Sequence, residues 1–163
     1  MPIINSVLSW FMMQRNHQIE TFMRYPNEVQ EDLLKKLIGF ARHTEFGQKY
    51  DFSSITSTKE FQDRVPLQDY ESLKPYINRL KNGEQQLLWP SEIKWFAKSS
   101  GTTSDKSKFI PVSPTALEEC HFKAGKDLMA MYCNNYPDSK VFSGRGLVMG
   151  GSHQANQSDE KSK

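Results

Sequence analysis

Apolar side chains recur every three or four positions along the first part of the chain, which is the spacing of one face of an α-helix. Residues 4–24 form the first such segment, with an interruption of the apolar face at 15–18, and residues 28–43 form the second. Tyr25 precedes Pro26 and is therefore disfavoured in the α region, and Asn27 is a good N-cap for the second helix. Two apolar faces joined by a short connection predict an antiparallel helix pair.

Two further helices are predicted from their start and stop signals. Ser57 and Glu60 have the order of a capping box, in which Ser57 accepts from the Glu60 amide and the Glu60 side chain reaches back. Residues 68–81 carry apolar side chains on one helical face, and Asn82 followed by glycine ends that helix. Pro75 requires this helix to kink or to start later.

After residue 83 the apolar side chains no longer recur every three or four positions and occur in short runs. Short apolar and aromatic runs at residues 87–89, 93–96 and 109–112 predict strands. Ser113 followed by Pro114 predicts the start of a long helix over residues 114–134. A final buried strand, interrupted by glycines, is predicted over 141–142 and 146–149. The predicted fold class is therefore α/β, helical over 1–83 and mixed over 84–151.

Composition narrows the class of protein. The chain has 163 residues, 21 Lys+Arg against 19 Asp+Glu and a formal net charge of +2. This is the length of one soluble domain, and interspersed, nearly balanced charges argue against a nucleic-acid partner. No apolar run approaches the ~20 residues that span a bilayer, and the N-terminus lacks the features of a signal peptide. We therefore expect a cytoplasmic protein without a membrane partner, whose residues 152–163 form a disordered polar tail.

The cysteines and histidines indicate no disulfide or metal site. Cys120 and Cys133 are expected on one helix, where their spacing corresponds to about 20 Å, too far for a disulfide between them. We expect free thiols in a reducing compartment. The four histidines are scattered, and no cluster has metal-ligand spacing.

The segment between two predicted strands carries the candidate chemistry. It runs Lys98-Ser99-Ser100-Gly101-Thr102-Thr103-Ser104-Asp105-Lys106-Ser107-Lys108. Hydroxyls and amides donate to phosphate oxygens, glycine allows a close backbone approach, and an ammonium group offsets the phosphate charge. The composition fits a polyphosphate-binding loop, and it fits a solvated polar hairpin equally well.

Two common nucleotide-binding motifs are excluded by spacing. A Walker loop needs a second glycine directly before its lysine, and here Asp105 precedes Lys106. The later glycine-rich stretch at residues 144–151 has Met149 where a dinucleotide fingerprint has its third glycine. Neither a P-loop NTPase nor a Rossmann dehydrogenase is supported.

Residues 96–103, together with Lys108 and Pro111, resemble the first nucleotide-binding motif of the Gretchen Hagen 3 (auxin-responsive promoter) acyl-acid amido synthetases, in the adenylate-forming superfamily. That motif has the order Ser-Ser-Gly-Thr-Thr/Ser, any residue, Gly, two residues, Lys. Every position matches except Asp105, where glycine is usual. Residues 70–77 and 82–84 before the loop, and 142–152 after it, also resemble this family.

The resemblance implies ATP-dependent activation of a carboxylic acid to an acyl-adenylate, followed by attack of an amino acid amine. It implies ATP and Mg²⁺ as cofactors, small carboxylic acids and amino acids as substrates, and a catalytic role for Lys108 rather than Lys106. The implied nucleotide-binding residues are Ser99, Ser100, Gly101, Thr102 and Thr103. Because family members are much longer, the chain is expected to be the N-terminal part of a large nucleotide-binding domain, inactive without the remainder of its own longer chain.

Two other functions remain open from the residues alone. An acyl-CoA ligase would share the adenylate step and differ in using a thiol acceptor. A helical interaction module would bind a partner helix in the groove between the two N-terminal helices. Nucleotide binding separates both enzymes from the interaction module, and the acceptor separates the two enzymes.

Overall fold

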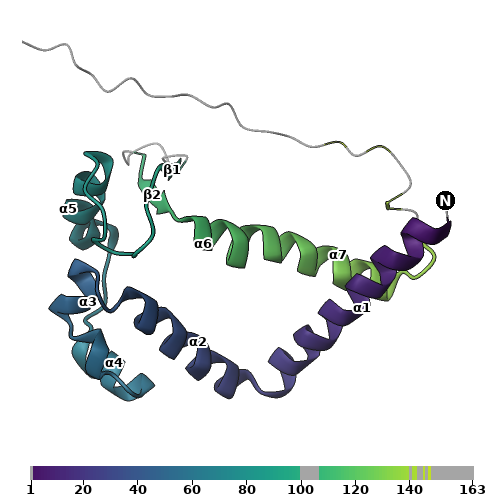
Figure 1. The fold of residues 1–163 in the computed structure, drawn as a ribbon, viewed down its shortest axis with the longest axis horizontal. Helices are drawn as coiled ribbons and strands as arrows, with labels where there is room; N and C mark the ends of the chain where they lie inside the picture. Colours follow the sequence, from purple (N-terminus) through teal and green to yellow (C-terminus); the bar gives the residue numbers. More distant parts are fainter. Residues whose placement is uncertain (1, 100–106, 140, 143–144, 146, 148–163) are drawn as a thin grey trace, which may run out of the picture.

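The computed structural model describes residues 2–99, 107–139, 141–142, 145 and 147. Three long helical segments form the sides of an open frame, and shorter helices gather beside a two-stranded sheet at one corner (Figure 1). The long segments are α1 (Pro2–Arg24), α2 (Pro26–Ala41) and the continuous run of α6 (Pro114–Ala116), η2 (Leu117–Phe122) and α7 (Lys123–Asn135). The predicted mixed class with leading helices is confirmed, with helices dominant in the described part.

The first two helices do not form the predicted antiparallel pair. Only Tyr25 separates α1 from α2, and Pro26 occupies the first turn of α2, so the predicted N-cap at Asn27 is wrong. Pro26 is already suited to a first helical position, and one non-helical residue cannot reverse the chain. Instead, α1 crosses α7 (Figure 1) and packs against it.

The α1–α7 contact is held by polar groups around a small buried residue. The guanidinium of Arg15 forms a bidentate ion pair with Asp127, through Nε to Oδ1 and through Nη2 to Oδ2 at 2.8 Å. The side-chain amide of Asn16 donates to the carbonyl of Ala130 at 3.2 Å, and Ala130 is fully buried. The predicted interruption of the apolar face at 15–18 is therefore the place where α1 meets α7.

A compact core lies at the C-terminal end of α2, where Ile38 and Ala41 pack with Phe52 and Ile55. Two short helices that the sequence did not predict complete it, α3 (Glu45–Lys49) and the 3₁₀ helix η1 (Phe52–Ser54). The cap of α3 is the buried Thr44, whose hydroxyl donates to the Ala41 carbonyl at 2.7 Å and accepts from the Gly47 amide at 3.0 Å. A Cβ on Gly47 would lie 2.0 Å from the Ala41 oxygen, so this turn requires glycine.

The helices α4 (Thr58–Arg64) and α5 (Tyr70–Lys81) confirm the sequence predictions with two changes. Ser57 accepts from the Glu60 amide at 3.2 Å, and the Glu60 carboxylate reaches back to accept chiefly from the Thr56 amide, at 2.7 Å, one residue before Ser57. The helix α5 begins later than residue 68, since a capping box of Asp69 with Ser72 fixes its start and leaves Pro75 inside it. Asn82 is its C-cap, and the following glycine has a φ of 95°.

The sheet consists of β1 (Trp95–Lys98) and β2 (Phe109–Val112), which are antiparallel with Lys98 opposite Phe109. The strand predicted at 87–89 is wrong, because the backbone of this segment hydrogen-bonds to α3 and not to another strand. The Leu87 carbonyl accepts from the Phe46 amide at 2.9 Å, at the start of α3, and the Leu87 side chain is buried with Leu80 and Ile93. The strand predicted at 93–96 begins only at Trp95.

The long C-terminal helix matches its predicted extent. Ser113 accepts from the Ala116 amide at 3.0 Å and Pro114 follows, as expected for this start. Its middle turn, η2, is a π-helix, which the sequence did not predict. Cys120 is exposed and Cys133 half-buried, and both thiols are free. No helix in the described part of the chain is long and apolar enough to cross a bilayer.

The final predicted strand is wrong where it can be examined. Val141 and Phe142 lie in a turn and are exposed, and Leu147 is also exposed. The other residues of that prediction, 146 and 148–149, and the predicted tail at 152–163 lie outside the described residues.

Candidate nucleotide-binding site

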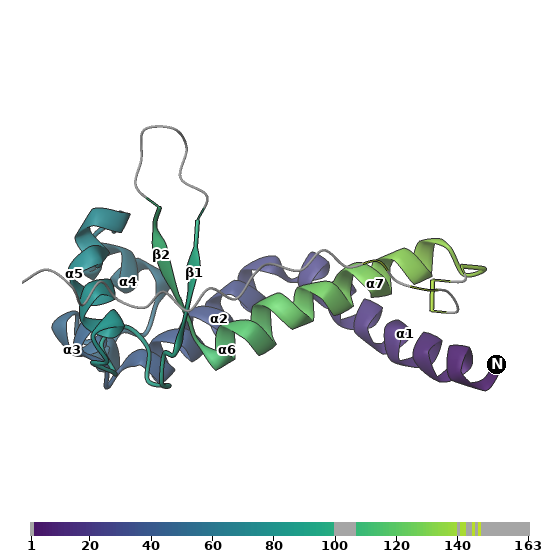
Figure 2. The same cartoon turned by 90° about the horizontal axis from the view of Figure 1, so that it is seen from above.

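The candidate loop is closed at its foot by Ser99 and Lys108, which follow β1 and precede β2. The Ser99 amide donates to the Lys108 carbonyl at 2.9 Å, and the Lys108 amide donates to the Ser99 hydroxyl oxygen at 3.0 Å. This pair extends the β1–β2 register by one position, so the two strands deliver both ends of the segment to one point (Figure 2).

Only two of the six residues predicted for the site belong to the described part of the chain. Ser100, Gly101, Thr102 and Thr103 lie outside it, as does Lys106. Ser99 was predicted to donate to phosphate, and its oxygen accepts the Lys108 amide here. A hydroxyl that accepts one bond still carries a proton that it can donate. Ser99 therefore closes the loop and keeps its capacity to contact an anion.

Lys108 is exposed and lies over the ring of Tyr70, with Nζ 5.4 Å from the ring centroid. Among the described carboxylates, Asp69 responds electrostatically to Lys108. Its pKa lies below the ordinary value, chiefly because its carboxylate accepts from the Ser72 amide, and Lys108 adds a smaller electrostatic contribution. The Asp69 carboxylate accepts from the Ser72 amide at 2.7 Å and does not lie within 4.0 Å of the Lys108 ammonium.

Tyr70 is a residue whose part in the site the sequence did not show. The sequence places it among the apolar positions of the helix predicted over 68–81, and within the segment 70–77 that resembles the family, without giving it a role in the site. In the structure its hydroxyl oxygen accepts from the Phe109 amide at 3.0 Å, which ties the start of α5 to β2. The chemistry of tyrosine offers the one signal for this contact, because a half-buried tyrosine hydroxyl needs a polar partner.

Two more lysines lie at the foot of the loop, around the ring of Phe109. The Nζ of Lys81 is 4.1 Å from the ring centroid and that of Lys98 is 6.0 Å from it. Among the described residues, neither these two ammonium groups nor that of Lys108 has a carboxylate within ion-pair distance. Three such positive charges beside a hydroxyl-rich segment favour an anionic ligand with several charges, such as a polyphosphate.

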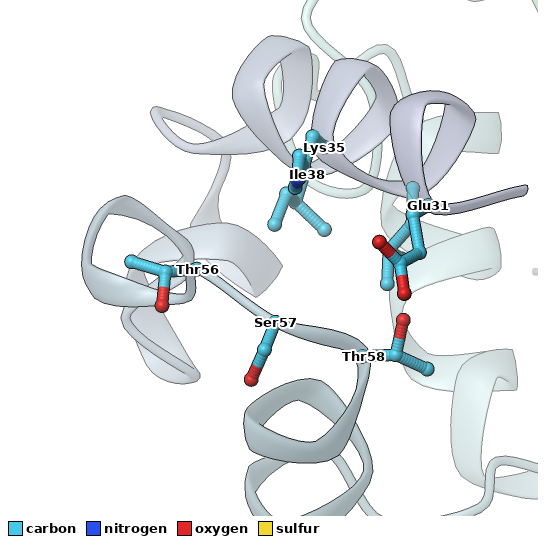
Figure 3. Close-up of a pocket in the computed structure, with 7 residues that line it drawn as sticks. Glu31, Lys35, Ile38, Thr56, Ser57 and Thr58 are labelled. Carbon is cyan, nitrogen blue, oxygen red and sulfur yellow. The ribbon is translucent and has the colours of Figure 1, made fainter. Parts of the chain in front are cut away.

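A small hollow lies elsewhere, between α2 and the start of α4 (Figure 3). Glu31, Lys35 and Ile38 line one side of it, and Thr56, Ser57 and Thr58 line the other. Its volume of about 60 Å³ is far below the ~300 Å³ of ordinary ligand pockets. Within the described residues, no group of three or more His, Cys, Asp or Glu side chains could hold a metal ion.

Comparison with solved structures identifies the class of fold. The chain is similar to the structure of the GH3.15 acyl acid amido synthetase, with a TM-score of 0.65 and 22% sequence identity over 73% of this chain and 21% of that one. At this level of identity the similarity concerns the fold alone, and it shows that this chain folds like part of an acyl acid amido synthetase.

The sequence assigns the family itself. The model of the GH3 family N-terminal domain matches residues 15–162, and the chain belongs to this family. It is 35% identical to the indole-3-acetic acid-amido synthetase GH3.2 of Arabidopsis thaliana, over 61% of this chain and 18% of the relative. It is 30% identical to the jasmonoyl-L-amino acid synthetase JAR6 of Nicotiana attenuata, over 62% and 18%. The chain thus spans less than a fifth of the length of these relatives.

Proposed function

We propose that this domain forms part of an acyl-acid amido synthetase that activates a carboxylic acid with ATP and joins it to an amino acid. The observation that carries the proposal is the foot of the loop, where the Ser99–Lys108 pair closes a motif of nucleotide-binding type beside three ammonium groups that have no carboxylate partner among the described residues. The similar relatives are named for joining indole-3-acetic acid or jasmonate to amino acids, which supports the same two substrate classes here.

In the proposed reaction, a carboxylate oxygen attacks the α-phosphorus of ATP and pyrophosphate leaves with the electrons of the broken P–O bond. The amine of the amino acid then attacks the acyl carbon, loses a proton, and AMP leaves. The first step needs charge stabilisation and alignment more than a general base. In this scheme Lys108 offsets the charge at the reacting phosphate.

The nucleotide would be held by the loop: the hydroxyls and amides of Ser99, Ser100, Thr102 and Thr103 donate, and Gly101 lets the backbone approach. The three ammonium groups at the foot of the loop fit a polyphosphate. Mg²⁺, bound chiefly through phosphate oxygens, would add neutralising charge there. We place the reaction in the cytoplasm, where the free thiols of Cys120 and Cys133 stay reduced.

The helical interaction module is not supported by the geometry. That hypothesis needed a groove between the first two helices, and α1 packs on α7 instead of lying along α2. The acyl-CoA ligase differs from the proposed synthetase only in its acceptor, so the experiment must include both acceptors.

The test uses a full-length synthetase that carries this domain, incubated with ATP, Mg²⁺ and a panel of aromatic and aliphatic acids. We expect exchange of labelled pyrophosphate into ATP that depends on the added acid, and an amide product when amino acids are supplied. Acid-dependent exchange followed by a thioester with coenzyme A, and no amide, would assign the alternative ligase. Absence of exchange with every acid would refute adenylate formation.

A further inference from the structure

Tyr70 makes two contacts with the strand end at which the loop closes. Its hydroxyl oxygen accepts from the Phe109 amide at 3.0 Å, and its ring lies under the Lys108 ammonium at 5.4 Å. Tyr70 is the first residue of α5, where the Asp69 cap accepts from the Ser72 amide at 2.7 Å. The ring is therefore carried by a helix end that is itself fixed.

The strand register explains why the Phe109 amide needs this partner. In an antiparallel pair, residues that exchange hydrogen bonds alternate with residues that do not. Because Ser99 and Lys108 are hydrogen-bonded, the next pair, Lys98 with Phe109, is a non-bonded one. The Phe109 amide then points away from β1 to the outer edge of the sheet, where the Tyr70 hydroxyl meets it. The backbone on either side of the Lys108 side chain is thus held, by Ser99 and by Tyr70.

The ring of Tyr70 acts on the Lys108 side chain itself. A free lysine loses considerable rotamer freedom when it is ordered against a ligand. An aromatic face restricts the side chain before the ligand arrives, and, unlike a carboxylate, it does not neutralise the positive charge. Within the described residues no carboxylate lies within 4.0 Å of Lys108, so its charge stays available to an anion.

We propose that Tyr70 is a positioning residue that holds Lys108 in the orientation in which its ammonium group meets the reacting phosphate of ATP. The proposal rests on the proposed function and adds to it a residue outside the loop motif. The hydroxyl of Tyr70 sets the backbone direction at Lys108, and its ring sets the side-chain direction.

The test measures pyrophosphate exchange in the full-length synthetase with Tyr70→Phe, which keeps the ring, and Tyr70→Leu, which removes both contacts. We expect Tyr70→Phe, which loses one hydrogen bond, to lower kcat/KM for ATP about fivefold. Tyr70→Leu, which also loses the ring contact, should lower it about twentyfold. The KM for the carboxylic acid should not change. Tyr132→Phe, which removes the hydroxyl of an exposed tyrosine on α7, is the matched control and should leave both parameters unchanged.

The decisive measurement is a double-mutant cycle with Lys108→Ala. If Tyr70 acts through Lys108, adding Tyr70→Phe to the Lys108→Ala variant should not lower the rate of pyrophosphate exchange any further. Where that exchange is too slow to measure, the ATP dissociation constant from calorimetry should likewise stay unchanged. Equal losses in both backgrounds, with the thermal midpoint lowered in parallel, would show a merely structural role and overturn the inference. An unchanged rate for Lys108→Ala alone would instead refute the role of Lys108 in the proposed function. Tyr70→Phe decides the matter even if Tyr70→Leu does not fold.

Discussion

The ion pair between Arg15 and Asp127 should hold α1 on α7, and its removal should measurably destabilise the chain. The pair joins residues more than a hundred positions apart, and the two side chains are only 14% and 26% exposed. The perturbation is Arg15→Ala, which leaves the Asp127 carboxylate partly buried without its partner.

The magnitude follows from the geometry. The pair makes two charge-assisted hydrogen bonds, each worth about 1.5 kcal/mol or more when buried. Partial exposure lowers this, because exposed pairs contribute only ~0.2–1 kcal/mol in all. We therefore expect a loss of about 2 kcal/mol in the free energy of unfolding. With a urea dependence of about 2 kcal/mol per M, the midpoint should fall by about 1 M.

The assay is urea unfolding of the 163-residue chain, followed by circular dichroism at pH 7. The matched control is Asp63→Ala, which breaks the Lys59–Asp63 pair within one helix, whose side chains are 82% and 63% exposed. That control should shift the midpoint by less than ~0.2 M. A shift for Arg15→Ala no larger than the control would show that the ion pair does not hold α1 on α7.

The same ion pair predicts how the stability difference between wild type and Arg15→Ala depends on pH. The pKa of Asp127 is held below its ordinary value of 3.8, chiefly by its hydrogen bond with Arg15. A lowered folded-state pKa means that the stabilisation is complete above about pH 4 and is lost as the pH falls through that lower pKa. The gap between wild type and Arg15→Ala should therefore be constant from pH 5 to 7 and shrink below pH 4.

Four further predictions concern the loop, the core and the isolated chain. In the full-length synthetase, Lys108→Ala should lower pyrophosphate exchange by tenfold or more and Lys106→Ala by less than twofold; the reverse order would place the wrong lysine at the phosphate. Gly101→Val should abolish ATP binding by calorimetry while the circular dichroism spectrum is kept, and unchanged affinity would refute the loop assignment. Gly47→Ala should cost about 3 kcal/mol in unfolding free energy or prevent folding, because its Cβ would lie 2.0 Å from the Ala41 oxygen; a midpoint equal to wild type would contradict this. The 163-residue chain alone should form no AMP from ATP and any acid above background, and acid-dependent AMP would show that it is a sufficient enzyme.

Local features of the fold could be predicted because their causes are local. Ser57 and Ser113 each accept from an amide three residues on, and each starts a helix where the sequence placed it. The glycine after Asn82 takes the positive φ that ends α5. These positions follow from side-chain chemistry within one turn, which a sequence shows directly.

The errors come from partners distant in sequence. The apolar run at residues 87–89 has a strand pattern, but the Leu87 carbonyl serves the Phe46 amide and its side chain fills the core. The apolar face of α1 predicts packing against α2. In the structure its polar residues Arg15 and Asn16 instead bind Asp127 and the Ala130 carbonyl on α7. Periodicity shows that a face will be buried without showing which element buries it.

The candidate site likewise has a part that the sequence predicts and a part that only the fold shows. The motif predicts Ser99 and Lys108 as site residues, but it does not predict the helix that supports β2. That helix, α5, contacts the strand after the loop through both ends, since Tyr70 binds the Phe109 amide and Lys81 lies over the Phe109 ring. Its inner face is anchored by the buried Ile77 and Leu80. Because one anchored helix contacts both the amide and the ring of Phe109, the direction in which Lys108 leaves the sheet depends on the packing of α5 as well as on the hydrogen bonds between Ser99 and Lys108.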